Sequence, residues 1–224
     1  MTDVQLFKFV NLYIEWFAFG GFIAGCLAYR RYGHLWPITA ILLITFCKNH
    51  FASYGAKYYR SNVEIYHFFN PIQFLLLSIF FYKNFQDKLF KKIVLYTSGA
   101  GVAFAIINSF FIQKIHSDPM NFMTVETLIL IAYATLLFIE RIDLPSNINI
   151  FKDPVFITTI AILCFNLFIF LYFLLTNYFW SHKIDQMGTL FRINYFSNFL
   201  YYPMLFIASL YSLNKINHSA ENRQ

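Results

Sequence analysis

The sequence predicts an all-α fold: a polytopic membrane protein built as one bundle of seven transmembrane helices. Its 224 residues are 58% hydrophobic and 12% charged, with a mean hydropathy of +0.53, whereas soluble domains carry roughly 25% charged residues. Seven apolar stretches are each long enough to cross the ~30 Å hydrocarbon core of a bilayer as a helix. The linkers between them are short, which favours antiparallel neighbours in a single domain.

The seven spans are predicted in order from their apolar runs and from the residues that bound or interrupt them. Pro71 in the third span removes one helical hydrogen bond and predicts an irregular turn beside Asn70. Small residues at 98–101 in the fourth span predict a close helix approach. Asp118-Pro119 and Asp153-Pro154 each place an acidic N-cap before a proline at the first helical position, which marks the starts of the fifth and sixth spans. The spans are residues 5–28, 35–54, 64–82, 91–112, 119–139, 154–178 and 189–213, within a transmembrane domain of residues 1–214 followed by a short polar cytoplasmic tail, 215–224.

The distribution of Lys and Arg predicts the orientation of the bundle. If the N-terminus lies outside, the inner connections hold ten basic residues and the outer loops hold four. Short cytoplasmic loops collect Lys and Arg, so the bias predicts an N-terminus outside and a C-terminus inside, in a bacterial inner (cytoplasmic) membrane. The opening residues lack the basic leader and small-residue cleavage site of a signal peptide, so the first span is expected to be retained. The inner set is Arg30, Arg31, Lys83, Lys88, Lys91, Lys92, Arg141, Lys152, Lys215 and Arg223, and the outer set is Lys57, Arg60, Lys114 and Lys183.

Polar side chains inside the spans gather at one depth, in the outer half of the bilayer. Such groups are costly in lipid and usually face the bundle interior, so their shared depth predicts an outward-facing pocket. Glu15 and Glu126 are the two carboxylates inside the spans, and each should pair with a cation or be protonated. A competing interpretation is that the polar residues only hold the helices together by hydrogen bonds. The pocket candidates are Glu15, Lys48, His50, His67, Asn70, Gln73, Glu126, Arg192, Asn194 and Asn198.

A spacing match suggests an internal duplication. Glu15 precedes Arg30 by the interval that separates Glu126 from Arg141, and each pair crosses its span from an outer acid to an inner arginine. The pattern is typical of a parallel repeat, with spans 1–3 repeated as spans 5–7 and the fourth span as linker, as in some small transporters. Further pairs at similar depths are Lys48-Asn49 with Asn166, and Asn70 with Asn194.

Several chemistries are set aside because the residues they need are missing. The last span has no lysine after Arg192 for a retinal Schiff base and no histidine to complete a metal site. Motifs for intramembrane proteolysis are absent. Cys26, Cys47 and Cys164 form no CxxC pair, and we expect them to be small buried packing residues. We therefore expect no catalytic residues, no metal and no cofactor.

Three functions remain open. The leading hypothesis is a pocket that binds, and translocates, a small polar solute. The first alternative is a membrane receptor or accessory subunit that acts with a cytoplasmic protein partner in a bacterial signalling or defence system, and the second is a membrane-embedded enzyme. The net charge of +6 is explained by basic residues between the spans, so we expect the lipid bilayer as a partner and no nucleic acid.

Overall fold

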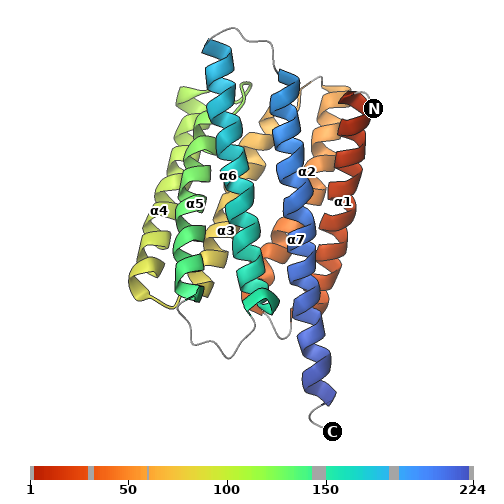
Figure 1. Cartoon of the computed structure of the whole chain (residues 1–224). Coiled ribbons are helices and arrows are strands. Elements are labelled where there is room, and N and C mark those ends of the chain that lie inside the picture. The colour runs from red at the N-terminus through yellow and green to blue at the C-terminus, as the bar shows by residue number, and fades with distance from the viewer. Residues whose placement is uncertain (1–2, 30–32, 60, 143–149, 182–186, 222–224) are drawn as a thin grey trace.

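A computed structural model describes residues 3–29, 33–59, 61–142, 150–181 and 187–221, which form a bundle of seven α-helices (Figure 1). No strand occurs in these ranges, so the all-helical prediction is confirmed. Two 3₁₀ turns, η1 (Gly33–Leu35) and η3 (Ile150–Lys152), precede α2 and α6, and α4 continues into a π-helical turn, η2 (Asn108–Ile112). The helices are α1 (Asp3–Ala28), α2 (Trp36–Tyr58), α3 (Val63–Asn84), α4 (Lys88–Ile107), α5 (Met120–Ile142), α6 (Pro154–Ser181) and α7 (Met187–Glu221).

Six of the helical segments are long and apolar enough to cross a membrane, as expected of a multi-pass membrane protein. The longest helix, α7, is not among the six over its described residues. Asn194, Asn198 and several tyrosines interrupt its apolar sequence, so the seventh span stays a prediction. The six segments are Phe9–Ala28, Gly33–Tyr58, Val63–Asn84, Lys88–Ile112, Met120–Ile142 and Pro154–Thr176.

Acidic caps begin two of the helices. The Asp153 side chain accepts a hydrogen bond from the backbone N–H of Val155 at 3.3 Å, so α6 begins at Pro154 with the cap that the sequence predicts. Asp87 caps α4 in the same way, accepting from the N–H of Leu89 at 2.5 Å. The carboxylate at each position satisfies a backbone donor that has no partner within the helix.

Three local details differ from the sequence prediction. α3 remains α-helical through Pro71, so the irregular turn expected beside Asn70 is not present, and the backbone departs from α-helical geometry at η2 instead. α5 begins at Met120, one residue later than predicted. Cys26 is exposed on the outside of the bundle, so its prediction as a buried packing residue is wrong.

Six helices form a closed ring, and α4 lies outside it. α1 packs against α2 and α7, α3 packs against α2 and α5, and α6 packs against α5 and α7, while α4 contacts α3 and α5 (Figure 1). Neighbours along the chain are antiparallel, so the contacts between α3 and α5 and between α7 and α1 join parallel helices. The start of α1 and the end of α7 lie at opposite ends of the bundle, called here the N-terminal end and the far end (Figure 1).

Of the basic residues used for the orientation, most of those that the structure describes lie at the far end. The end of α3, the start of α4 and the end of α5 meet there, whereas the end of α2 and the start of α5 lie at the N-terminal end. Among the described residues, Lys and Arg are therefore more numerous at one end of the bundle than at the other, as the sequence indicates. Arg30, Arg31, Arg60, Lys183 and Arg223 lie outside the described residues.

Close packing joins α3 to α5 and to α4. Phe74 of α3 has no exposed surface, and its ring meets Phe122 of α5 edge-on at a centroid separation of 6.0 Å. On the other side, a Cβ added to Gly101 of α4 would lie 2.6 Å from the Cε1 atom of Phe74. The close helix approach predicted for residues 98–101 is therefore confirmed at Gly101.

Replacing Gly101 with alanine should lower the free energy of unfolding by about 1–3 kcal/mol, because the new methyl group overpacks the buried Phe74 ring. Gly99 supplies the matched control, since a Cβ added there would meet nothing within 4 Å. Gly99→Ala should be neutral or stabilising by up to about 1 kcal/mol, because it gains helix propensity without a clash. Thermal unfolding of the two variants in detergent measures the difference, and equal melting temperatures would contradict it.

Candidate functional site

A cavity of about 290 Å³ lies inside the ring, in the half nearer the N-terminal end. All six ring helices line it, and α4 contributes no residue. At about 30 Å³ for each water, the cavity has room for roughly ten waters, and it is about twice the size of a ~150 Å³ cavity that binds benzene. Six of the ten predicted pocket residues line it, namely Lys48, Asn70, Gln73, Glu126, Asn194 and Asn198.

The Lys48 side chain is anchored on the wall formed by α2 and α3. Its Nζ donates to Gln73 Oε1 at 2.7 Å, and Gln73 Nε2 donates in turn to Thr45 Oγ1 at 3.1 Å. The ammonium group also lies over the ring of Tyr66, 5.8 Å from its centroid, where cation–π attraction stabilises the charge. An ammonium group has three N–H donors, and Gln73 takes one of them.

Glu126 is the one carboxylate among the described residues that line the cavity. Its carboxylate interacts electrostatically with Lys48. The Lys48 nitrogen and the Glu126 oxygens are more than 4.0 Å apart, so the two residues form no ion pair. No hydrogen bond to Glu126 is present among the described side chains and backbone. Asn70 is also unsatisfied, since its side chain is 5% exposed and its Nδ2 donor has no partner. Because buried polar groups without partners are costly, this set is typical of a site that a polar ligand completes.

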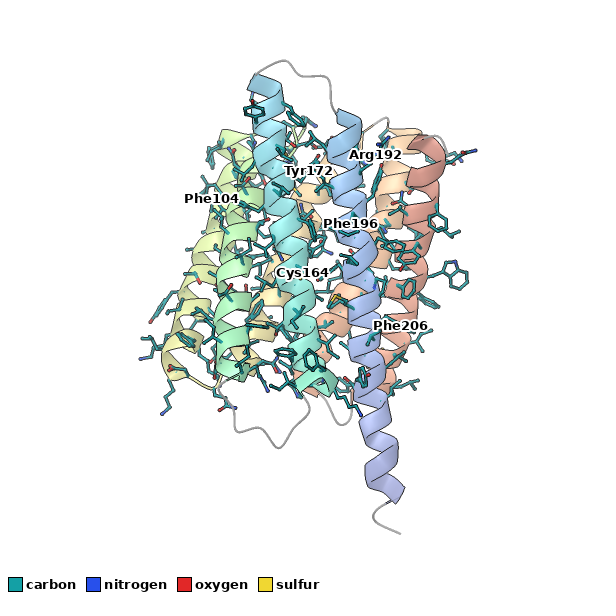
Figure 2. All side chains as sticks on the ribbon, viewed as in Figure 1. Phe104, Cys164, Tyr172, Arg192, Phe196 and Phe206 are labelled. Carbon is teal, nitrogen blue, oxygen red and sulfur yellow. The ribbon has the colours of Figure 1, made fainter. Side chains whose placement is uncertain are left out.

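Aromatic rings form the side of the cavity made by α6 and α7. Phe165 stacks on Tyr201 with ring centroids 4.4 Å apart, and Tyr201 meets Tyr202 edge-on at 5.1 Å. Both tyrosines are buried. Tyr172 lies higher on α6, toward the N-terminal end (Figure 2). The wall opposite the lysine is therefore rich in π-faces, which can bind apolar groups or cations.

A polar network ties four helices together at the far end, away from the cavity. Glu140 Oε1 accepts hydrogen bonds from the backbone N–H groups of Gln86 at 2.5 Å and Asp87 at 3.2 Å. The neighbouring Arg141 donates to the carbonyl of Asn84 at 3.3 Å and pairs with Asp153 at 3.6 Å. α5 thus holds the α3–α4 connection and the start of α6, which fixes this end of the bundle.

Four predicted pocket residues do not reach the cavity. Glu15 is half-buried on α1 but is not part of the lining, and His50 is exposed, with its ring edge-on to Phe46 at 4.4 Å. Arg192 is exposed on α7 toward the N-terminal end (Figure 2).

His67 is buried, but its contacts are structural. Its Nδ1 lies 2.7 Å from Ser109 Oγ in η2, and its Nε2 lies 2.6 Å from the carbonyl oxygen of Ser117. The ring therefore joins α3 to η2 and to the connection that follows it, with both nitrogens engaged away from the cavity. Hydrogen bonding between helices, the competing interpretation of the polar layer, applies at this residue.

The cavity also contains polar residues that were not among the pocket candidates. Asn11 lies on α1 and Tyr66 on α3, while Asn166 lies on α6 and donates from Nδ2 to the carbonyl of Ile162 at 2.8 Å. Tyr201 and Tyr202 could have been found from helical spacing. They follow Asn194 and Asn198 at intervals of three or four residues, which places all four on one face of α7.

Compared with protein-family models, with curated proteins and with solved structures, the chain shows no match.

Proposed function

We propose that the chain is a seven-span protein of the bacterial cytoplasmic membrane that binds a small polar solute from the outer side and carries it across. The observation that supports this is the cavity: six helices enclose about 290 Å³ that contains one ammonium, one carboxylate and several amides. Ionisable groups inside membrane spans are costly, and they commonly mark a substrate path. A purely structural role would pair these charges with each other, and Lys48 and Glu126 form no ion pair within 4.0 Å.

Two features of the ring support translocation over simple binding. With α4 outside, α1–α3 and α5–α7 form two halves of equal helix number, joined by two parallel contacts, α3 with α5 and α7 with α1. Transporters built from parallel repeats hold their substrate between two such halves. Asn70 and Asn194, paired in the proposed repeat, both line the cavity. Glu15 and Glu126, the acids whose spacing suggests the repeat, are not equivalent, since only Glu126 lines the cavity.

The proposed orientation predicts opposite results for two fusions. A reporter that is active only in the cytoplasm should be active after Gln224 and inactive after Tyr59, because the ten-to-four basic bias places the N-terminal end of the bundle outside. A periplasm-specific reporter at the same two positions is the control for expression. The reverse pair of activities would invert the bundle and turn the cavity toward the cytoplasm.

Cysteine labelling tests the proposed function. Asn198→Cys, in a background without Cys26, Cys47 and Cys164, should react with an impermeant thiol reagent from outside, and a transporter should also expose it to the cytoplasmic side during its cycle. Ser212→Cys is the matched control on α7, because Ser212 is 1% exposed near the far end and should not react from outside. No reaction of Asn198→Cys from outside would contradict an outward cavity.

A second candidate function, a receptor or accessory subunit, is favoured by a specific feature of α7. This helix continues to Glu221, past the ends of the other helices at the far end (Figure 1). A helical extension on the proposed cytoplasmic side offers a contact for a soluble partner, and small helix shifts can carry a signal along it. Labelling of Asn198→Cys only from outside, under every condition tried, would favour this function over transport.

A further inference from the structure

We propose that the cavity selects a small zwitterion, a molecule that carries a cationic ammonium and an anionic carboxylate or phosphate. This inference rests on the proposed function and specifies its solute class. Lys48 and Glu126 are the charged residues among those that line the cavity, so its wall contains one charge of each sign. The two groups interact electrostatically but do not form an ion pair. Because both residues line the same cavity, a ligand inside it can reach and neutralise both.

The anionic group of the ligand would bind at the wall that holds Lys48. Gln73, itself held by a hydrogen bond to Thr45, accepts from one of the three N–H donors of the Lys48 ammonium. Asn70, one turn before Gln73 on α3, presents a side chain whose Nδ2 donor has no partner. A carboxylate or phosphate supplies several acceptor sites and a negative charge, so it can accept from both donors and also neutralise the ammonium, which a neutral hydroxyl does not do.

The cationic group would bind near Glu126 of α5, beside the aromatic side of the cavity that the neighbouring helix α6 forms with α7. The Glu126 carboxylate accepts no hydrogen bond from the described residues, and Tyr201 lies within its electrostatic reach. Tyr201 and Phe165 stack on each other, and both line the cavity. A carboxylate combined with aromatic faces is the environment that stabilises an ammonium or a quaternary amine.

Charge balance decides the selectivity. A zwitterion compensates both buried charges, whereas a singly charged ligand leaves one of them desolvated without a partner. Removing one member of a buried charge pair typically weakens binding by about 30-fold or more. An amino acid loses one charge and gains a methyl group when it is converted to its methyl ester, and it loses the other charge and gains an acetyl group when it is N-acetylated. Each of these analogues should therefore bind at least about 30-fold more weakly than the parent zwitterion.

Thermal shift of the purified full chain tests this with defined probes. The set contains α-amino acids, ω-amino acids of increasing length, glycine betaine and glycerophosphocholine, and each amino acid that binds is compared with its methyl ester and its N-acetyl derivative. At least one zwitterion should raise the melting temperature in a dose-dependent way, and both singly charged analogues should be weaker. In Lys48→Gln, discrimination against the methyl ester should disappear. Binding of glycerophosphocholine alone would identify a lipid headgroup as the source of the zwitterion, and binding of amino acids or betaine would identify a free solute.

Two results would overturn the proposal. One is equal stabilisation by a zwitterion and either of its singly charged analogues. The other is no stabilisation by any zwitterion in the set while Asn198→Cys reacts from outside, because the cavity would then be open but not selective for this chemistry. Failure of the Asn198→Cys labelling itself would instead contradict the proposed function, so the two failures can be told apart.

Discussion

Replacing Glu126 with glutamine should abolish solute binding and leave the fold intact. The carboxylate lines the cavity and accepts no hydrogen bond from the described residues, so the isosteric amide removes a ligand contact but no contact within the protein. We expect solute affinity to fall about 30-fold or more and the melting temperature without ligand to change little. Thermal shift with the zwitterions that stabilise the unmodified chain measures both.

Glu15→Gln is the control for this experiment. It removes the same charge from a half-buried position on α1 outside the cavity lining, so affinity should stay within about threefold. If Glu126 were a structural ion, its neutralisation would destabilise the protein by roughly 3–5 kcal/mol because Lys48 would be left uncompensated. A large loss of folded protein in Glu126→Gln would therefore contradict a ligand-binding role for Glu126 and favour a role in helix packing.

Truncating Phe74 to alanine should give the largest loss of stability, about 3–5 kcal/mol. The ring is fully buried between Phe122 and Gly101, so its removal leaves a cavity where α3, α4 and α5 meet. Phe68→Ala on the same helix is the control, because that side chain is 65% exposed on the outside of the bundle and its loss should change stability by no more than about 0.5 kcal/mol. Denaturant or thermal unfolding in detergent compares the two, and similar losses would contradict the packing described for α3.

The helices could be predicted from the sequence because length and apolarity decide them. All seven predicted segments are helical, and the acidic cap at Asp153 marks the start of α6 as expected. These signals are local: an apolar run of about 20 residues and a cap need no knowledge of neighbours. The exclusion of α4 from the ring depends on packing between helices far apart in the sequence, which no local pattern indicates. The small residues around Gly101 predicted only that α4 packs closely on another helix, not where it lies.

The candidate site could be predicted only in part, because depth in a membrane does not determine rotation about a helix axis. Lys48 and His50 share a depth, but two residues turn the helix by about 200°, so one faces the cavity and the other faces outward. Arg192 and Asn194 differ in the same way. Helical phase, applied to each polar residue in turn, would have removed His50 and Arg192 from the candidates.

His67 and Glu15 needed the structure. His67 is only three residues from Asn70, close in phase, yet it turns to η2 because Ser109 and the carbonyl of Ser117 satisfy both ring nitrogens. Glu15 lies directly after Ile14, which lines the cavity, at the edge of the face that α1 presents. No periodicity in the sequence indicates on which side of such an edge a side chain falls.

The position of α4 gives the ring two kinds of boundary with the hydrocarbon. α7 and α1 pack extensively, so that parallel contact is sealed by the two helices themselves, while α3 and α5 touch more sparsely and are covered from outside by α4. A polar cavity behind a thin wall would otherwise lie close to the lipid tails. α4 adds a second layer of protein outside this boundary, and its Gly101 packs directly against Phe74 of α3.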